Sequence, residues 1–546
     1  MIREGGCSRH EENPATTMAR DIFLDLCGFV ADSGRDAGGL ELSFGSGTPA
    51  VGPPAVLIPC WRCDMSDQWR AHVIGWLREN KDRIVHASAS TEEDALWEFT
   101  ARGVVRLAFD PVSVLLLSLQ LVPTLDRTLD SHGRDREDED PLWRAELATF
   151  PYVNDLVAIT ETAADAALRS ASEFLLAKPR WPRGVAWVMG ISHDIDHLRK
   201  WRPENRELRI ADVKRAIRNR QGVGRSLRSL LTSMIGPGLG WPDPFRNVAE
   251  LMTLEAARRV RASYFFGIAD PHASPFEISY APDEIQRGID FRALRELGHE
   301  VGLHASYSSA GAEGRLRAER GRLAAIAGGN IEGVRQHYLR FRAASTPGKQ
   351  VRAGFLFDSS WGYPGRPGFR GGIASPFWIG RSEEGSQGLV ELPMTAMDTS
   401  LREFLRSSFR DSTRILDELL TSAARVGGLA VLNWHNNAFD RELASGDDGL
   451  FRWTIDRART LGATLMPLGE IADWWRYRSS IAYARYEEGI RFSHPEALRG
   501  TEFRVLGMAP DLSSATSQDV AVHVDGRGRT SWVVSAGGTQ RSIRLR

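Results

Sequence analysis

Residues 192–197 read SHDIDH and directly follow the apolar run VAWVMGI at 185–191. Alternate side chains share one face of an extended segment, so Asp194 and Asp196 can project together into a cleft at the end of a strand. Two such carboxylates can divide their roles, because one can bind a cation while the other accepts a proton from an attacking water. The segment therefore predicts metal chemistry at the end of a buried strand.

Five further segments place polar residues at or just past an apolar run. They are GHEVGLHASYSS at 298–309, GVRQHYLRF at 333–341, FDSSW at 357–361, ELPM at 391–394 and VLNWHNN at 431–437. The ends of strands are where barrels and open sheets of the α/β type carry their active sites. We therefore expect partners for the two aspartates in these segments.

The order and content of the segments resemble the polysaccharide deacetylase family with NodB homology, metal-dependent carbohydrate esterases, over residues 183–478. The resemblance implies a role for each matching residue: Asp194 as catalytic base, Asp196 and His304 as metal ligands, Arg335 as the group that orients the base, Asp358 as the catalytic-site aspartate of the fourth motif, paired there with Trp361, and His435 as general acid. Trp361, Tyr363, Arg370 and Tyr338 are expected to shape the substrate pocket.

One position departs from the family pattern. Ser308 stands four residues after His304, where the family has its second metal-binding histidine. A serine hydroxyl is a poor zinc ligand beside imidazole or carboxylate. We take His337 as the first candidate for the missing ligand, and His193 or His197 as the second. The expected cofactor is a divalent ion, zinc first, with cobalt, nickel or iron as alternatives.

The central region alternates between apolar runs and helical patterns, as a barrel of parallel strands and helices requires. Candidate strands lie at 185–191, 262–268, 299–304, 333–338, 388–394, 429–435 and 463–468, and helical patterns include 282–297, 412–426 and 451–461. The predicted fold class is α/β. Seven strands would give the distorted (β/α)7 barrel of NodB-homology type that the resemblance implies.

The regions outside the barrel have patterns of their own. We expect residues 1–20 to be disordered and 21–180 to form a mixed α/β accessory domain, with helical spacing at 110–121 and 152–177. Residues 479–546 predict a small β-rich domain. It includes a hairpin of 520–524 and 530–535 around the turn dipeptide at 525–526.

A basic insertion at 199–245 follows the first motif, and residues 199–228 hold eleven Arg or Lys against three acidic residues. One interpretation is a solvated helical flap over the barrel mouth. The other is peripheral contact with an anionic membrane or a lipid-linked glycan through 199–230. Interleaved aromatic residues, which nucleic-acid binding surfaces use, are missing, so we expect no nucleic-acid partner.

Composition limits the class of protein. The chain has 546 residues, 42% of them hydrophobic and 25% charged, with a formal net charge of −1, which indicates a multidomain globular protein without a bulk polyanionic partner. No apolar run is long enough to span a membrane, and the first residues lack the apolar core of a secretion signal, so we expect a cytoplasmic protein. Cys60 and Cys63 are expected to be ordinary thiols.

These observations predict a metal-dependent hydrolase that removes N-acetyl groups from an amino-sugar glycan or glycan precursor. Two alternatives remain open. One is a hydrolase of another non-peptide C–N bond on the same barrel. The other is a non-catalytic glycan-binding or assembly protein with a degenerate metal site, which the serine at position 308 favours.

Overall fold

The computed structural model describes most of the chain. The described residues are 14–29, 40–44, 54–59, 67–89, 96–119, 129–137, 140–144, 146–200, 243–270, 273–380, 388–440, 447–481, 483–486, 489–492, 501–508, 520–524, 530–534 and 542–544. The thiols at 60 and 63, and nearly all of the basic segment 199–230, lie outside these ranges. The predictions made for them therefore stay predictions.

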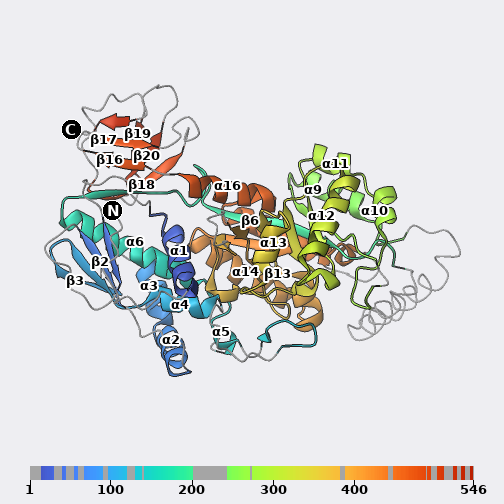
Figure 1. The fold of residues 1–546 in the computed structure, drawn as a ribbon, viewed down its shortest axis with the longest axis horizontal. Helices are drawn as coiled ribbons and strands as arrows, with labels where there is room; N and C mark the ends of the chain where they lie inside the picture. Colours follow the sequence, from blue (N-terminus) through green and yellow to red (C-terminus); the bar gives the residue numbers. More distant parts are fainter. Residues whose placement is uncertain are drawn as a thin grey trace.

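A curled sheet forms the centre of the molecule, in the strand order β11-β12-β10-β9-β8-β7-β6-β14-β13 (Figure 1). Its strands are β6 (Trp187–Ile195), β7 (Ser263–Phe266), β8 (Glu300–Ala305), β9 (Gly333–Gln336), β10 (Phe357–Asp358), β11 (Phe377–Ile379), β12 (Leu389–Glu391), β13 (Met394–Met397), β14 (Leu429–Asn433) and β15 (Ala463–Met466). Strand β15 pairs with β6 outside this order. Neighbours in the described sheet pair in parallel, except β11 with β12.

The mixed α/β class and the distorted barrel expected from the sequence are confirmed, with the sheet curled into a half-barrel. Each of the seven predicted runs contains a strand, and the run at 388–394 supplies two because Pro393 interrupts it. The two-residue β10 and the antiparallel β11 were not predicted, since neither lies in a long apolar run.

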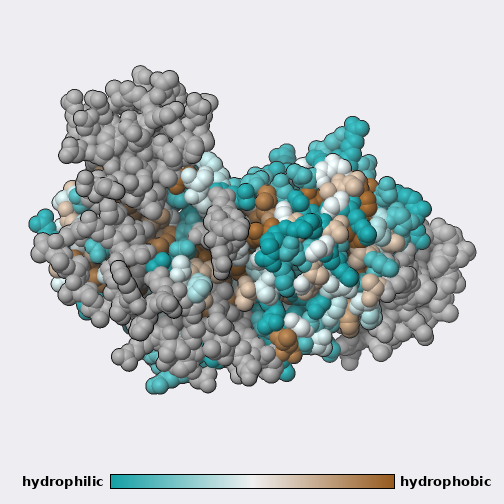
Figure 2. Space-filling model, viewed as in Figure 1, coloured by the Kyte–Doolittle hydropathy of each residue, from teal (hydrophilic) through white to brown (hydrophobic). Residues whose placement is uncertain are grey.

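Helices cover the outer side of this sheet: α9 (Val248–Ala257), α10 (Pro282–Gly288), α11 (Phe291–Glu296), α12 (Glu313–Ala327), α13 (Thr346–Arg352), α14 (Phe409–Arg425), α15 (Asp447–Thr460) and α16 (Leu468–Ser480). Every residue of β6 is buried, as expected for a central strand that is covered on both faces. On the face shown in Figure 2, hydrophilic side chains cover much of these helices. Among the described helices, none has the length and apolar character needed to cross a membrane.

The N-terminal region has its own four-stranded sheet of order β1-β2-β4-β3, formed by β1 (Glu41–Phe44), β2 (Ala55–Ile58), β3 (Trp97–Ala101) and β4 (Val104–Leu107). Its helices are α1 (Pro14–Cys27), α2 (Asp67–Glu79), α3 (Lys81–Ala89), α4 (Pro111–Ser118), α5 (Pro141–Arg144) and α6 (Tyr152–Ser170). Helix α1 corrects the expectation of disorder for residues 14–20, because its apolar face is buried at Ala19, Ile22 and Phe23.

The helical pattern at 152–177 is wrong beyond residue 170. Helix α6 ends there, Ser172 has a φ of 59°, and the chain continues as β5 (Phe174–Ala177). Strand β5 pairs antiparallel with β18 (Glu502–Gly507), a partner more than 300 residues away. Long-range strand pairing outweighs the local helical pattern here.

The C-terminal region is rich in β-strands. Strands β19 (Val520–Val524) and β20 (Thr530–Val534) pair antiparallel, which confirms the predicted hairpin pairing. They share a sheet of order β19-β20-β18-β5, and β16 (Tyr483–Tyr486), β17 (Gly489–Phe492) and β21 (Ser542–Arg544) form a second sheet. Through β5, the first of these sheets includes a strand that precedes the barrel in the sequence.

Candidate active site

The two aspartates of the first motif stand at the C-terminal end of β6, on the same face and two residues apart. Asp194 is almost completely buried. Its Oδ1 accepts a hydrogen bond from Arg335 Nη1 at 2.9 Å, and its Oδ2 accepts one from Asn433 Nδ2 at 2.7 Å. Burial raises the pKa of Asp194, but the Arg335 guanidinium, together with His304 and His435, outweighs burial and lowers it. Asp194 is therefore an ionised carboxylate in a fixed orientation.

Asp196, His304 and His337 form a group that could hold a metal ion. One ligand atom from each of these three residues lies within 4.8 Å of the others. His304 Nε2 is 3.2 Å and His337 Nε2 is 3.8 Å from Asp196 Oδ1. The ends of β6, β8 and β9 supply the three residues, because parallel strands bring their C-terminal ends to one edge.

The donor atoms of this group fit a divalent cation. Among the described residues, Asp196 Oδ1 and His304 Nε2, which face each other at 3.2 Å, are buried and have no hydrogen-bond partner of good geometry. Such atoms are costly to bury unless something binds them. One carboxylate and two imidazoles are ligands that zinc and its neighbours among the transition metals accept.

The charge states of Asp196 and His337 agree with that fit, whereas His304 differs: burial lowers its pKa, but Asp194 and Asp196 outweigh burial and raise it, so a cation would have to displace a proton from this ring. Burial opposes ionisation of Asp196, but the His304 ring beside it and the charges of the nearby histidines hold its pKa well below its usual range. Burial lowers the pKa of His337 to about 3, although Asp196 acts in the opposite direction. A neutral imidazole keeps the free lone pair that a metal ligand needs.

The other residues weighed as ligands are held elsewhere. The Ser308 hydroxyl donates a hydrogen bond to Glu277 Oε1 at 2.6 Å, so its partner is a carboxylate outside the metal-binding group. His197 Nδ1 hydrogen-bonds Ser279 Oγ at 2.7 Å. The two ring nitrogens of His193 bond the Trp434 carbonyl and Glu255 Oε1. Of the candidates named from the sequence, His337 is the one that the structure brings to Asp196 and His304.

His435 faces both aspartates from the end of β14. Its Nε2 lies 3.9 Å from Asp194 Oδ2 and 3.8 Å from Asp196 Oδ2. Its Nδ1 bonds Asp398 Oδ1 at 2.6 Å. Burial lowers the pKa of His435, but Asp398, with the two site aspartates, overcomes burial and raises it to about 10. The imidazole is therefore protonated near neutral pH, with Nε2–H directed into the site.

Sequence reasoning missed Asp398 and Asn433. Asp398 follows β13 directly, so it shows the same signal as the other site residues, a polar group just past an apolar run. Asn433 lies two residues before His435 in an extended segment, which places both side chains on one face. Asp398 could have been found by extending the quoted segment at 391–394, whereas Asn433 already lies within the quoted segment at 431–437.

Arg335 extends from β9 to the carboxylate of Asp194. Its Nη1 donates to Asp194 Oδ1 and to Ser192 Oγ, its Nε to the Ser359 carbonyl and its Nη2 to Ser359 Oγ. The guanidinium is fully buried and lies over the Phe265 ring. This network fixes the guanidinium against Asp194, the contact that the resemblance implies.

Asp358 lies on β10, and its hydrogen bonds go to residues outside the acid–base and metal-binding candidates. Its carboxylate accepts hydrogen bonds from Gln350 Nε2 at 2.7 Å and from the backbone and hydroxyl of Ser360. It is the parallel cross-strand partner of Glu391, and burial raises the pKa of both carboxyl groups. Asp358 was expected to be a catalytic residue, but its carboxylate contacts Gln350 and Ser360, and the carboxylate that contacts the candidate acid is Asp398.

The residues expected to shape the pocket separate into two groups. Trp361, Tyr363 and Arg370 are buried, and the Arg370 guanidinium lies over the Trp361 ring. Gly371 and Gly372 pack against Ser118 and Tyr152 of the N-terminal region. This group therefore fills the junction with that region. Tyr338, in contrast, is 39% exposed and lies beside His337.

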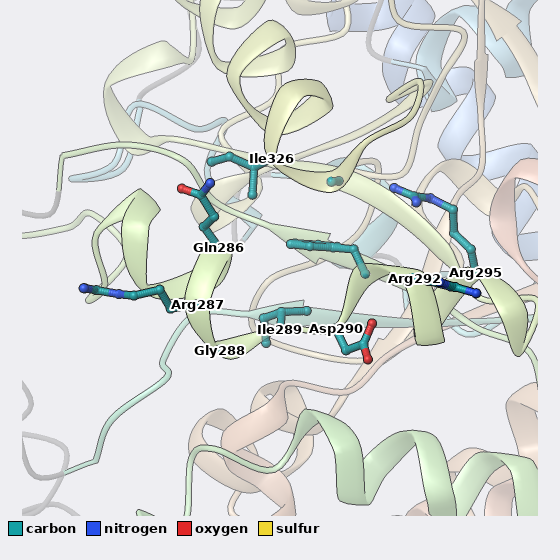
Figure 3. A pocket seen from close by; sticks show the side chains of 10 residues that line it. Gln286, Arg287, Gly288, Ile289, Asp290, Arg292, Arg295 and Ile326 are labelled. Atoms are coloured by element: carbon teal, nitrogen blue, oxygen red, sulfur yellow. The ribbon is translucent and has the colours of Figure 1, made fainter.

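A hollow of about 560 Å³ lies among the helices that flank the sheet (Figure 3). Residues 286–292, Arg295, Ile326 and Ala327 line it, from α10, α11 and α12. Two of its arginines are paired within their own helices, Arg287 with Asp283 and Arg292 with Glu296. It contains none of the metal-binding or acid–base candidates.

Comparison with known proteins gives structural matches alone. No family model and no curated protein matches the chain. Similar solved structures include a protein described as a polysaccharide deacetylase from Mycobacterium smegmatis, with 19% identity, 57% of this chain and 96% of that chain covered, and a TM-score of 0.36. Another is Puue allantoinase, at 14% identity, 55% and 93% coverage and a TM-score of 0.35. A third is the chitin deacetylase of Colletotrichum lindemuthianum, at 16% identity, 53% and 88% coverage and a TM-score of 0.27.

Proposed function

We propose that this protein is a metal-dependent hydrolase that releases acetate from the N-acetyl groups of an amino-sugar glycan or glycan precursor. The observation that supports the proposal is the meeting of three kinds of group at one edge of the sheet. These are a ligand set with unpartnered donor atoms, an oriented carboxylate and a protonated imidazole. Metal-assisted amide hydrolysis uses these three kinds of group, to activate the water, accept its proton and protonate the leaving amine.

The cofactor would be held by Asp196, His304 and His337. A divalent ion at this position would polarise an amide carbonyl and lower the pKa of a water molecule toward neutrality. Zinc is the first candidate, with cobalt, nickel and iron as alternatives.

Asp194 would act as the base. Arg335 and Asn433 each hold one of its oxygens, so the carboxylate cannot rotate away from the site. The lowered pKa of Asp194 keeps it ionised and ready to accept a proton from the attacking water. Arg335 is then a positioning residue, since it acts through Asp194.

His435 would act as the acid. Asp398 fixes its Nδ1, which leaves Nε2–H free to protonate the amine nitrogen as the C–N bond breaks. The proton lost by water is taken by Asp194, and the one gained by the amine comes from His435. The products are acetate and a free amino sugar.

The test compares wild type with Asp194→Asn after loading with zinc, cobalt, nickel or iron. Metal content is measured by mass spectrometry, and acetate release is measured from N-acetylated amino sugars and their oligomers. We expect near-stoichiometric metal in both proteins and a loss of activity of at least about 100-fold in the variant. An Asp196→Ala, His304→Ala double variant should lose the metal as well.

Other outcomes would favour the alternatives. Bound metal with no acetate release, together with cleavage of a cyclic ureide or another small amide, would replace the glycan substrate by a different C–N bond. Absence of metal after loading, with equal glycan binding by wild type and Asp194→Asn, would contradict hydrolysis. It would leave a glycan-binding protein.

A further inference from the structure

Four rings form a cluster beside the metal-binding group. They belong to His132, Phe276, Tyr307 and Tyr338, and we call them the rim cluster. Every pair of its members has ring centroids 4.6–5.9 Å apart. The four residues come from four separate segments of the chain, so the contacts depend on the tertiary fold. The mechanism proposed above uses none of these rings.

The rim cluster is continuous with the site. The Tyr338 ring lies 4.8 Å from the His337 ring, which lies 4.7 Å from the His304 ring. A path of ring contacts therefore leads from the metal-binding group outward to the rim.

The rim cluster is open to solvent. Phe276 and Tyr338 are each 39% exposed, although both are large aromatic residues. Aromatic rings that only stabilise a hydrophobic core are buried more completely, whereas exposed aromatic rings beside a site are typical of ligand contact. Solvent access and the path to the metal-binding group together distinguish these rings from the buried Trp361 group.

The backbone under Tyr338 is strained. Tyr338 and Leu339 have φ values of 59° and 52°, in the left-handed region that residues with a Cβ seldom adopt. Such strain is kept where the surrounding contacts enforce it, and it is found often at functional sites. Here it presents the Tyr338 ring at the surface while His337 points inward.

An N-terminal segment completes the rim cluster. Residues 129–137 supply His132, whose carbonyl accepts a hydrogen bond from Arg340 Nε at 2.7 Å. Arg134 of the same segment donates to the Tyr338 carbonyl at 2.8 Å and forms an ion pair with Asp130. Arg340 also lies over the Tyr307 ring. Two arginine–carbonyl hydrogen bonds, one given by each side, therefore hold the N-terminal segment against the barrel residues Tyr338 and Arg340.

We infer that the rim cluster is a sugar-binding platform for the unit next to the reacting sugar, and that the N-terminal segment adapts the site to oligosaccharides. The inference rests on the proposed function for the position of the reacting sugar. The C–H groups of a pyranose carry small positive charges that pack on the negative faces of aromatic rings. A single sugar held at the metal-binding group would leave the platform empty, so the preferred substrate has two or more sugar units.

The test uses the full metal-loaded chain and N-acetylglucosamine oligosaccharides of one to four units, in β-1,4 and β-1,6 linkage. Dissociation constants are measured by calorimetry and acetate release is measured in parallel. The variants are His132→Ala and Phe276→Ala. Phe99→Ala is the matched control, because Phe99 is an exposed aromatic residue on β3 of the N-terminal sheet. Metal content and melting temperature check that each variant is folded.

We expect affinity to rise from one unit to two or three in wild type and in the control. In each platform variant the gain should fall by roughly 3- to 10-fold, the effect of one aromatic contact. An affinity that does not depend on chain length, or a gain that both platform variants keep in full, would overturn the inference. Length-dependent binding that the platform variants weaken, without acetate release by any protein, would support the platform while the hydrolase proposal fails.

Discussion

At the scale of single residues, the protonation of the proposed acid, His435, depends on the carboxylate of Asp398. Asp398 Oδ1 accepts hydrogen bonds from the backbone N–H and from Nδ1 of His435, and no other described residue hydrogen-bonds that ring nitrogen. Replacing Asp398 by Asn keeps the shape but removes the charge that favours imidazolium. The pKa of His435 should then fall from about 10, and the alkaline limb of the activity profile should move to lower pH. We expect kcat to fall by about 10²- to 10³-fold.

Metal content separates this effect from damage to the ligand set. Asp398→Asn should bind the same amount of metal as wild type, because Asp398 contacts none of the three proposed ligands in the described structure. Asp290→Asn is a suitable control, since Asp290 caps α11 far from the site and Asn caps helices equally well. An unchanged pH profile in Asp398→Asn would assign His435 a role other than the acid.

At the scale of elements, close packing between strands decides whether Arg335 can reach Asp194. Gly333 begins β9, and a Cβ at this position would lie 2.1 Å from the buried Phe357 ring of β10. Gly333→Ala should therefore force the two strands apart and lower the free energy of unfolding by about 1–3 kcal/mol. In Gly75→Ala the added methyl group meets nothing within 4 Å inside α2, so denaturation should show equal or greater stability.

Elements of the barrel could be predicted from the sequence because each strand is a local apolar run followed by a polar residue. The base, the proposed ligands and the acid stand at such strand ends, including His337, which was placed in the ligand set despite the serine at 308. Prediction was less successful where position depends on distant partners. Strand β5 follows a helical pattern and is fixed by β18, while Trp361 is buried by contacts that a motif does not record.

At the scale of the whole molecule, buried polar contacts connect the barrel to the N-terminal region. Arg478 of α16 is fully buried and donates to the side chain and carbonyl of Asp25 in α1, at 3.0 and 2.7 Å, and to the Pro179 carbonyl at 2.9 Å. The planar guanidinium serves these three acceptors together. A lysine ammonium would keep the charge but could not match the fork geometry.

Arg478→Lys should therefore leave buried carbonyl groups unpaired and lower the free energy of unfolding by about 2–4 kcal/mol. Arg476→Lys in the same helix is the control, because Arg476 is only partly buried and the substitution should change stability by less than about 0.5 kcal/mol. Urea denaturation followed by tryptophan fluorescence measures both. If Arg478→Lys matches its control, the junction does not depend on this arginine, and α1 would be held mainly by its apolar face.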